Sequence, residues 1–245
     1  MIYSVKLAVC SHCSSPDLVK NGKTSYGSQR CLCKKCKKSR VAGFDSSVLD
    51  WRALLILRGF RERLSLRGLM RMFGISWKSL YELFNGHVKS LSRHRETVLQ
   101  FQSGDVLEFD ELCSFVGRKN QKRWVWTALS RRTRQIVGWV VGDRSNETFK
   151  RLLRKVPLDY LRTRSYSDKW KSYRILLTKK NHKMTGKGEG ETSHMERWNC
   201  TLRQRMSRFV RKSLAFSKRD RYHQMALKLF IWFYNKEREE ILHQH

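Results

Sequence analysis

Residues 106–110 read VLEFD, an extended apolar run that ends in a carboxylate. Two further apolar runs follow it, RWVWTALSR at 123–131 and QIVGWVVG at 135–142. Their β-branched and aromatic residues predict buried strands. The short link at 131–134 fits a hairpin between the second and third runs. This stretch therefore predicts three consecutive antiparallel strands.

The elements expected after these strands define the fold class. Residues 146–156 predict a helix, the run RSYS at 164–167 predicts a strand that leads into Asp168, and residues 193–214 predict a late helix that carries Glu196. This order is typical of an α/β, ribonuclease-H-like fold. In such a fold the first strand lies at the centre of the sheet, beside the strand that carries the second acid. Asp110 and Asp168 are therefore expected to come into contact range.

Asp110, Asp168 and Glu196 are three carboxylates in a chain with 52 Lys and Arg and only 21 Asp and Glu. Hard divalent cations prefer oxygen ligands, and a pair of such ions can activate the attacking oxygen of a phosphodiester reaction and stabilise the leaving oxygen. We therefore hypothesise a shared metal site. In the alternative, Ser193 and Glu196 form a capping box and Glu196 only bonds the start of its helix.

Other acids near these positions have different expected roles. Glu111 follows Asp110 directly, so in a strand it points to the opposite face and is expected to form a salt bridge. Glu108 lies on the same face as Asp110 and is a reserve ligand. Asp143 is expected to end a strand or cap the next helix.

Several uncharged or weakly basic residues have two interpretations. His194 is a candidate for proton transfer. Trp170 and Tyr173 fit either base stacking near the cleaved end or core packing. Cys113 and Cys200 are expected to be buried thiols.

The composition of the 245 residues points to a polyanionic partner. The formal net charge is +31 and the pI is near 10.4, which favours nucleic acid. A membrane-surface protein would concentrate its basic residues beside an apolar anchor, whereas here they occur in every segment and no apolar stretch approaches the length of a membrane span. The N-terminus does not resemble a signal peptide. We expect a cytoplasmic, nucleoid-associated protein without a membrane partner.

The N-terminal cysteines form two C-x2-C pairs, Cys10 with Cys13 and Cys33 with Cys36. Two such pairs can complete a tetrahedral Zn²⁺ site, and a segment this short and polar needs the metal to fold. Cys31 is a possible substitute ligand, but the spacing favours Cys33. Residues 1–45 are therefore predicted to be a zinc-binding knuckle.

Residues 48–92 predict a helix-turn-helix segment. Residues 66–73 and 77–85 have the pattern of two helices, preceded by a helix near 51–60, and the turn at 74–76 contains Gly74 and the potential cap Ser76. A plain three-helix bundle is the alternative. In a helix-turn-helix the second helix enters the major groove. The residues then expected near base edges or phosphates are Arg61, Arg63, Arg67, Arg71, Ser76, Lys78, Ser79 and Glu82.

From residue 106 onward the chain resembles the transposases of the insertion-sequence-one family, which belong to the DDE transposases. The resemblance is carried by the stretch from FDELCSF at 109–115 to GDRS at 142–145, by YSDKWKSY at 166–173, by HMERWNCTLRQRMSRFVRKSLAFSK at 194–218, and by Phe-Tyr-Asn at 233–235. Members of the family also carry a four-cysteine zinc knuckle and a helix-turn-helix, so the resemblance covers nearly the whole chain.

The resemblance implies a catalytic triad of Asp110, Asp168 and Glu196 in a domain from 104 to 245. It implies two Mg²⁺ ions, for which Mn²⁺ can substitute, and a structural Zn²⁺. Asn199 and Arg203 match positions that follow the family's glutamate, and helical spacing puts 196, 199 and 203 on one face. Further DNA contacts are assigned to Arg205 and Arg208.

The expected function is therefore that of a transposase that binds the terminal inverted repeats of its element, cuts DNA there and joins the released 3′-hydroxyl to a double-stranded target. Because two DNA ends must meet, at least a dimer is expected on DNA, and the apolar segment 225–234 is a candidate contact surface, with core packing as the alternative. Two other functions fit parts of the sequence: a DNA-binding regulator without catalysis, and a ribonuclease-H-like nuclease that cuts without joining.

Overall fold

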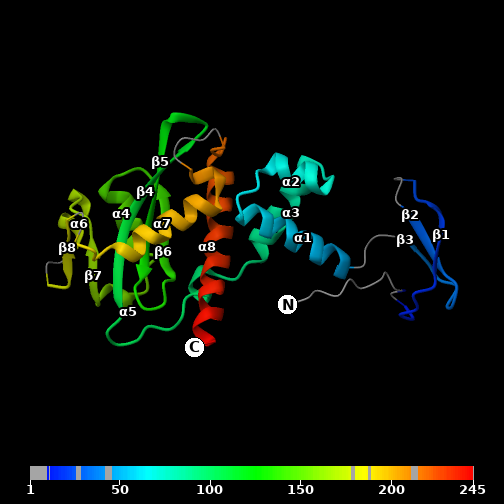
Figure 1. Ribbon diagram of the computed structural model, residues 1–245, viewed down its shortest axis with the longest axis horizontal. Helices are drawn as coiled ribbons and strands as arrows, with labels where there is room; N and C mark the ends of the chain where they lie inside the picture. Colours follow the sequence, from blue (N-terminus) through cyan, green and yellow to red (C-terminus); the bar gives the residue numbers. More distant parts are fainter. Residues whose placement is uncertain are drawn as a thin grey trace. The chain divides into compact units, whose positions relative to one another are not determined.

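The computed structural model describes residues 10, 12–25, 29–41, 46–177, 180–186, 189–210 and 215–244 (Figure 1). Residues 1–9, at the N-terminus that does not resemble a signal peptide, lie outside these ranges. The chain divides into two compact units, Met1–Gly59 and Phe60–His245. The segment before β4 belongs to the second unit, where Leu99 N–H donates to Gln135 Oε1 (2.9 Å).

The first unit contains a small antiparallel sheet in the order β1-β2-β3. Its strands are β1 (Leu18–Lys23), β2 (Gln29–Cys33) and β3 (Ser39–Val41). Most of the residues on β1 are exposed, so this sheet has little apolar core of its own. Helix α1 (Ser46–Arg61) begins in this unit and ends in the second, and it is longer than the predicted 51–60.

Helices α2 (Leu66–Phe73) and α3 (Trp77–Ser90) follow, with the turn between them at the predicted place. Gly74 ends α2 at φ 58°, a left-handed conformation that glycine adopts at low cost. Ser76 caps α3 by accepting from Ser79 N–H, as predicted. α3 continues past residue 85 to Ser90, because it packs against the long helix α8 (Asp220–His243).

The second unit is built on a five-stranded sheet in the order β6-β5-β4-β7-β8. Its strands are β4 (Val106–Val116), β5 (Arg118–Ser130), β6 (Ile136–Gly142), β7 (Arg164–Ser167) and β8 (His182–Met184). β5 is antiparallel to β4 and β6, whereas β7 is parallel to β4 and to β8. β4 therefore lies at the centre beside β7, as predicted. Asp110 does not end its strand, because β4 remains paired with β5 beyond it.

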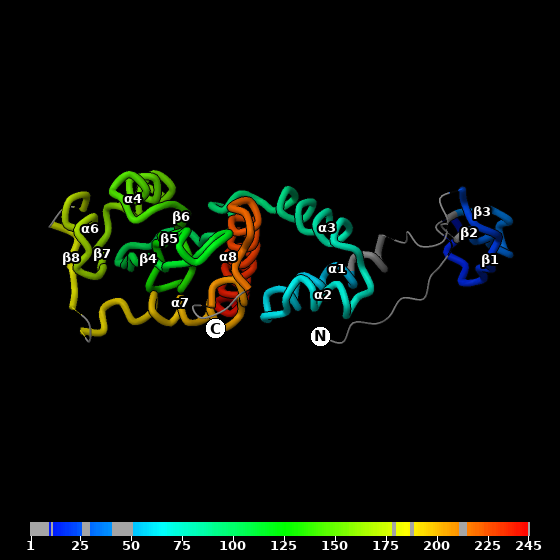
Figure 2. The backbone as a smooth tube through the Cα atoms, turned by 90° about the horizontal axis from the view of Figure 1, so that it is seen from above, coloured from blue at the N-terminus to red at the C-terminus, as the bar shows by residue number. Residues whose placement is uncertain are grey.

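Helices cover both faces of this sheet, and Figure 2 shows α4 and α7 on opposite sides of it. One face carries α4 (Asn146–Leu153), α5 (Leu158–Leu161) and α6 (Lys171–Leu176), and its core includes Leu107 and Phe109 of β4. Glu108 and Asp110 alternate to the other face, toward α7 (Ser193–Arg205). α4 ends earlier than the predicted residue 156.

α7 and α8 correct two predictions. α7 ends at Arg205, not near residue 214, and is followed by the short 3₁₀ helix η2 (Ser207–Phe209); residues 211–214 lie outside the described ranges. α8 buries Leu227, Phe230 and Ile231, so the segment 225–234 is core packing and not a free contact surface.

Asn235 explains the place of the Phe-Tyr-Asn motif. Its buried amide accepts from Ile136 N–H (2.9 Å) and donates to Ile136 C=O (2.9 Å), so it pairs α8 with the edge strand β6. The 3₁₀ helix η1 (His94–Thr97) joins the same contact, because Asn235 also donates to Thr97 Oγ1 (3.0 Å).

Across the described part of the chain, no helix combines the length and the apolar character that a bilayer span requires.

Candidate functional site

Asp110 and Asp168 meet because β4 and β7 are parallel neighbours. Glu108 pairs with Tyr166, and each acid lies two residues further along its own segment. One carboxylate oxygen of Asp110, one of Asp168 and one of Glu111 lie within 4.8 Å of one another. Two of the three predicted acids are thus brought together where β7 ends beside the central strand β4.

Asp110 is held in a defined orientation on the α7 face. Its Oδ1 accepts from Glu111 N–H (2.8 Å) and its Oδ2 accepts from Asn199 Nδ2 (2.6 Å). Burial raises the pKa of the Asp110 carboxyl to about 6, and the charges of Asp168 and Glu196 add to the shift. The metal-free protein therefore concentrates negative charge here at a cost that a bound cation would offset.

Asp168 is exposed at the end of β7. Its Oδ1 accepts from Trp170 N–H (3.0 Å), which fixes the carboxylate in the turn before α6. Its exposure leaves the carboxylate accessible from solvent. Asp168 can therefore bind the same cation as the more buried Asp110.

Glu111 lies on the opposite face of β4 and forms the predicted salt bridge, with Arg144. Its Oε2 also accepts from Tyr173 OH (2.6 Å). Burial raises the pKa of the Glu111 carboxyl to about 7, with Asp110 and Asp168 adding to the shift. The sequence does not predict that this carboxylate lies close to both Asp110 and Asp168. Alternation along β4 places Glu111 and Asp110 on opposite faces, and it gives no information about Asp168, which follows a different strand.

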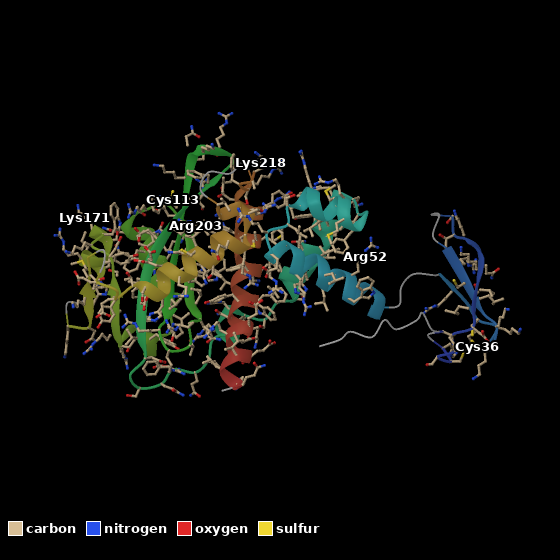
Figure 3. The ribbon with its side chains drawn as sticks, in the orientation of Figure 1. Cys36, Arg52, Cys113, Lys171, Arg203 and Lys218 are labelled. Atoms are coloured by element: carbon tan, nitrogen blue, oxygen red, sulfur yellow. The ribbon has the colours of Figure 1, made fainter. Side chains whose placement is uncertain are left out.

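Glu196 lies in the first turn of α7 and is exposed. Its oxygens are not part of the carboxylate cluster found among the described residues, although its charge acts on the pKa of Asp110. Asn199, one turn later, contacts Asp110, so the predicted face of α7 points toward the cluster. The capping box is not formed as expected, because the N-cap is Thr192 and its side chain makes no capping bond. Arg203 projects from the same helix (Figure 3).

Glu108 is a helix cap and not a spare ligand. Its Oε2 accepts from Met195 N–H (2.9 Å) in the first turn of α7, while its Oε1 accepts from Arg131 Nε (2.9 Å) and lies 2.6 Å from His194 Nδ1. The carboxylate is fully buried. His194 is thereby held against Glu108.

The chemistry of the carboxylate cluster fits divalent cations of the Mg²⁺ class. All donors are hard oxygens, they converge within 4.8 Å, and burial has already raised the pKa of two of them. Asp110, Asp168 and Glu111 each offer one of the converging oxygens that could hold such an ion.

The four predicted cysteines form a second cluster in the first unit. Cys10 Sγ and Cys36 Sγ are 3.6 Å apart, as are Cys13 Sγ and Cys33 Sγ, and all four sulfurs lie within 4.8 Å of one another. A tetrahedral Zn²⁺ site with Zn–S bonds of about 2.3 Å requires sulfurs about 3.8 Å apart. The donor set therefore fits Zn²⁺.

Local geometry explains why the two cysteine pairs converge. Each pair is closed by a backbone bond to the carbonyl of its first cysteine, from Ser14 N–H (2.8 Å) and from Lys37 N–H (2.9 Å). Both donors have a left-handed backbone, with φ of 55° and 60°. Cys31 lies in mid-strand, paired with β1 and β3, outside the cluster.

The candidate DNA contacts fall into two groups. Exposed side chains on or beside α2 and α3 are those of Arg63, Arg67, Arg71, Ser76, Lys78, Ser79 and Glu82. By contrast, Arg205 bonds Glu62 and Glu237, and the buried Arg61 bonds Glu237 (2.6 Å). Arg208 donates to Ser217 Oγ (2.9 Å), and burial lowers its pKa to about 10. The side chains of this second group are engaged in contacts within the protein.

Five residues with two interpretations, or with a predicted burial, also have defined places. Tyr173 is fully buried in the core, which excludes base stacking in this conformation. Trp170 is half-buried against the same core. Cys113 is half-buried and Cys200 is exposed on α7, so the prediction of two buried thiols was wrong. Asp143 directly follows the end of β6 and accepts from Ser145 Oγ and Thr148 Oγ1 (2.5 Å each), whereas the N-cap of α4 is Ser145.

Comparison with known proteins identifies the family. A family model described as IS1 transposase matches residues 106–236. The insertion element iso-IS1n protein InsB of Shigella dysenteriae is 35% identical over 126 residues, 51% of this chain and 93% of that protein. The insertion element IS1 protein InsB of Shigella flexneri is 34% identical over 124 residues, 51% and 92% of the two chains. The insertion element IS1 4 protein InsB of Escherichia coli (strain K12) is 34% identical over 125 residues, 51% and 72% of the two chains. Because the family model covers more than half of the chain, the chain belongs to the IS1 transposase family.

Proposed function

We propose that this transposase binds the terminal inverted repeats of a bacterial-type insertion sequence and catalyses metal-dependent DNA cleavage and strand transfer. The observation that carries the proposal is the convergence of Asp110 and Asp168, which parallel pairing of β4 and β7 brings together from distant parts of the sequence. The strand order, with β5 antiparallel on one side of β4 and β7 parallel on the other, supports a ribonuclease-H-like catalytic domain.

In this proposal Asp110, Asp168 and Glu196 hold two Mg²⁺ or Mn²⁺ ions. When bound, the ions would supply the positive charge that favours deprotonation of the attacking water or 3′-hydroxyl and stabilises the leaving oxygen. Asn199 fixes the orientation of Asp110 through its 2.6 Å bond. Arg203, on the same helix as Glu196, would bind a substrate phosphate. One carboxylate site can serve both chemical steps, since each is an in-line displacement at phosphorus.

The N-terminal half is proposed to recognise DNA. The four-cysteine cluster would hold a structural Zn²⁺, and α2 and α3 would act as a helix-turn-helix with α3 in the major groove. The exposed basic side chains of α2 and the start of α3 support this assignment, as does the net charge of +31.

A strand-transfer assay tests the proposal, using Mg²⁺, the full chain and oligonucleotides with the ends of the element. The expected result is cleavage at the 3′ ends followed by joining to a target duplex. Shifted but uncut DNA would point to a regulator, and cut but unjoined DNA to a nuclease. Asp110→Asn should abolish both steps and leave DNA binding intact.

Two ends must be processed together, so the active species is proposed to be at least a dimer on DNA. Sedimentation of the chain with end oligonucleotides should show complexes that contain two protein copies and two ends. A complex with a single copy that still joins DNA would contradict this part of the proposal.

A further inference from the structure

Arg144, in the loop between β6 and α4, lies over two tryptophan rings. Its guanidinium carbon lies 3.5 Å from the ring centroid of Trp170 and 4.4 Å from that of Trp124. Guanidinium groups stack favourably on aromatic faces, and contact with two rings restricts the freedom of the side chain. The side chain therefore has a fixed place between β5 and the segment that follows Asp168.

The same guanidinium also fixes Glu111. Arg144 Nε donates to Glu111 Oε1 (2.9 Å), and Arg144 Nη2 donates to the same oxygen. The other oxygen of Glu111 accepts from Tyr173 OH (2.6 Å). The Glu111 side chain is 1% exposed, so its charge depends on these bonds. Both oxygens of Glu111 are thus engaged, which favours an anchoring role for it over that of a cation ligand.

These contacts lead directly to Asp168. Trp170, which stacks on Arg144, gives its backbone N–H to Asp168 Oδ1 (3.0 Å), and Tyr173 lies one turn further along α6. β7 is only four residues long and ends at Ser167, before Asp168. The position of Asp168 beyond the sheet therefore depends on the segment 168–173, and that segment is attached to β4 through Arg144 and Glu111.

We propose that Arg144 is a positioning residue that holds Asp168 beside Asp110 for divalent-cation binding. This inference rests on the proposed carboxylate site and adds to it a specific supporting set: Trp124, Arg144, Trp170, Glu111 and Tyr173. Arg144 does not contact the cation in this arrangement. It acts through Trp170 and Glu111.

The sign of one measurement separates positioning from simple electrostatics. Removing a positive charge near three carboxylates would, by Coulomb's law alone, tighten cation binding. Removing a positioning residue would weaken it, because Asp168 would lose its fixed place. Outer partners of metal ligands typically contribute about 10–100-fold to metal affinity.

The test measures direct Mn²⁺ binding to the full chain without DNA. The electron paramagnetic resonance signal of free Mn²⁺ is the readout. Arg144→Met, which keeps length and loses charge and planarity, should raise the Kd about tenfold or more. The matched control is Arg123→Met, because Arg123 also bonds a carboxylate through Nε and Nη2, that of Asp220 (2.8 and 3.0 Å), and is similarly exposed. The control should bind Mn²⁺ like the wild type. Unchanged or tighter binding by Arg144→Met would overturn the inference.

Further variants keep the test decisive if Arg144→Met does not fold. Arg144→Lys keeps the charge but cannot stack as a plane, so it should also bind Mn²⁺ several-fold more weakly; wild-type affinity would show that charge alone suffices. Trp170→Leu should weaken binding similarly, and the double variant Arg144→Met with Trp170→Leu should lose little more than the stronger single change. If the fold losses in Mn²⁺ affinity of the two single variants multiply in the double variant, the two residues act separately.

The Asp110→Asn variant distinguishes failure of this inference from failure of the proposed function. If it binds Mn²⁺ like the wild type, the proposed cation site itself is wrong. If it loses Mn²⁺ while Arg144→Met retains full affinity, the site stands and only the positioning role of Arg144 fails. DNA binding without divalent cations should be the same in all these variants.

Discussion

Asn199 donates a 2.6 Å hydrogen bond to Oδ2 of Asp110 and thereby ties helix α7 to the central strand of the sheet. Asn199 is buried, and its own Oδ1 has no partner within the described ranges, so the amide is committed to this one contact. The bond sets the distance between the strand that carries Asp110 and the helix that carries Glu196.

Asn199→Ala should therefore reduce DNA cleavage about 10–100-fold while DNA binding remains, because Asp110 loses the donor that orients it. The free energy of unfolding should fall by about 1 kcal/mol. Thr201→Ala is the control on the same helix, since Thr201 Oγ1 only bonds Arg197 C=O (3.0 Å). Equal activity of the two variants would argue against an orienting role for Asn199.

The raised pKa of Asp110 predicts a pH-dependent stability. Its carboxyl has a pKa of about 6 in the folded protein and 3.8 as its ordinary value, so between these values the folded state binds more protons than the unfolded state. The free energy of unfolding must then decrease as the pH rises through this window and stay lower above it. Asp110→Asn removes the effect and should be more stable than the wild type at pH 8, by on the order of 1–3 kcal/mol.

Urea unfolding without added Mg²⁺ or Mn²⁺ measures this difference at pH 8 and at a pH below 4, where the two proteins should differ little. Added Mn²⁺ should reverse the order at pH 8, because it stabilises only the protein with an intact cluster. A wild type that is the more stable protein at pH 8 without these ions would contradict the prediction.

The cysteine cluster predicts different outcomes for neighbouring substitutions. Cys33→Ser removes one of four converging sulfurs and should abolish stoichiometric zinc, whereas Cys31→Ser, two residues earlier in β2, should retain one zinc per chain. Elemental analysis of the purified full chains gives the stoichiometry. Loss of zinc from the Cys31 variant, or its retention by the Cys33 variant, would show that the ligands have been misassigned.

The exposed basic residues of α2 and α3 predict the salt dependence of binding to the element's ends. Arg67→Gln, Arg71→Gln and Lys78→Gln should each weaken binding and lower the slope of log K against log salt by about 0.9 per lost phosphate contact. Arg208→Gln should leave the slope unchanged, because Arg208 is bonded to Ser217 and lies over the Phe60 ring. A slope change confined to Arg208→Gln would reverse the assignment of the DNA-binding surface.

Two glycines form a matched pair for stability. A Cβ at Gly138 in β6 would lie 2.7 Å from Val156 Cγ2, so Gly138→Ala should destabilise the protein by on the order of 1–3 kcal/mol. Gly86 in α3 has open space around the same position, and Gly86→Ala should stabilise by about 0.5–1 kcal/mol, since alanine favours the helix. Thermal unfolding of both variants checks the signs.

Local features of this chain were predictable because neighbouring residues produce them. The cysteine spacing indicated the four sulfurs that converge, Gly74 and Ser76 marked the turn before α3, and apolar runs marked strands β4 to β6. Strand order followed from the sequence of elements, which brought Asp110 beside Asp168. Helix and strand ends were less predictable. α3 extends to Ser90 and packs against α8, whereas α7 ends at Arg205.

The sequence by itself determined which acids and cysteines were available and in which elements they lie, because spacing and periodicity act over a few residues. Only the tertiary structure decided that Glu108 caps α7, that Glu111 bonds Arg144 and Tyr173, and that α8 is buried. These partners are far apart in the chain, and their choice depends on how buried charges are neutralised once the sheet and helices have packed.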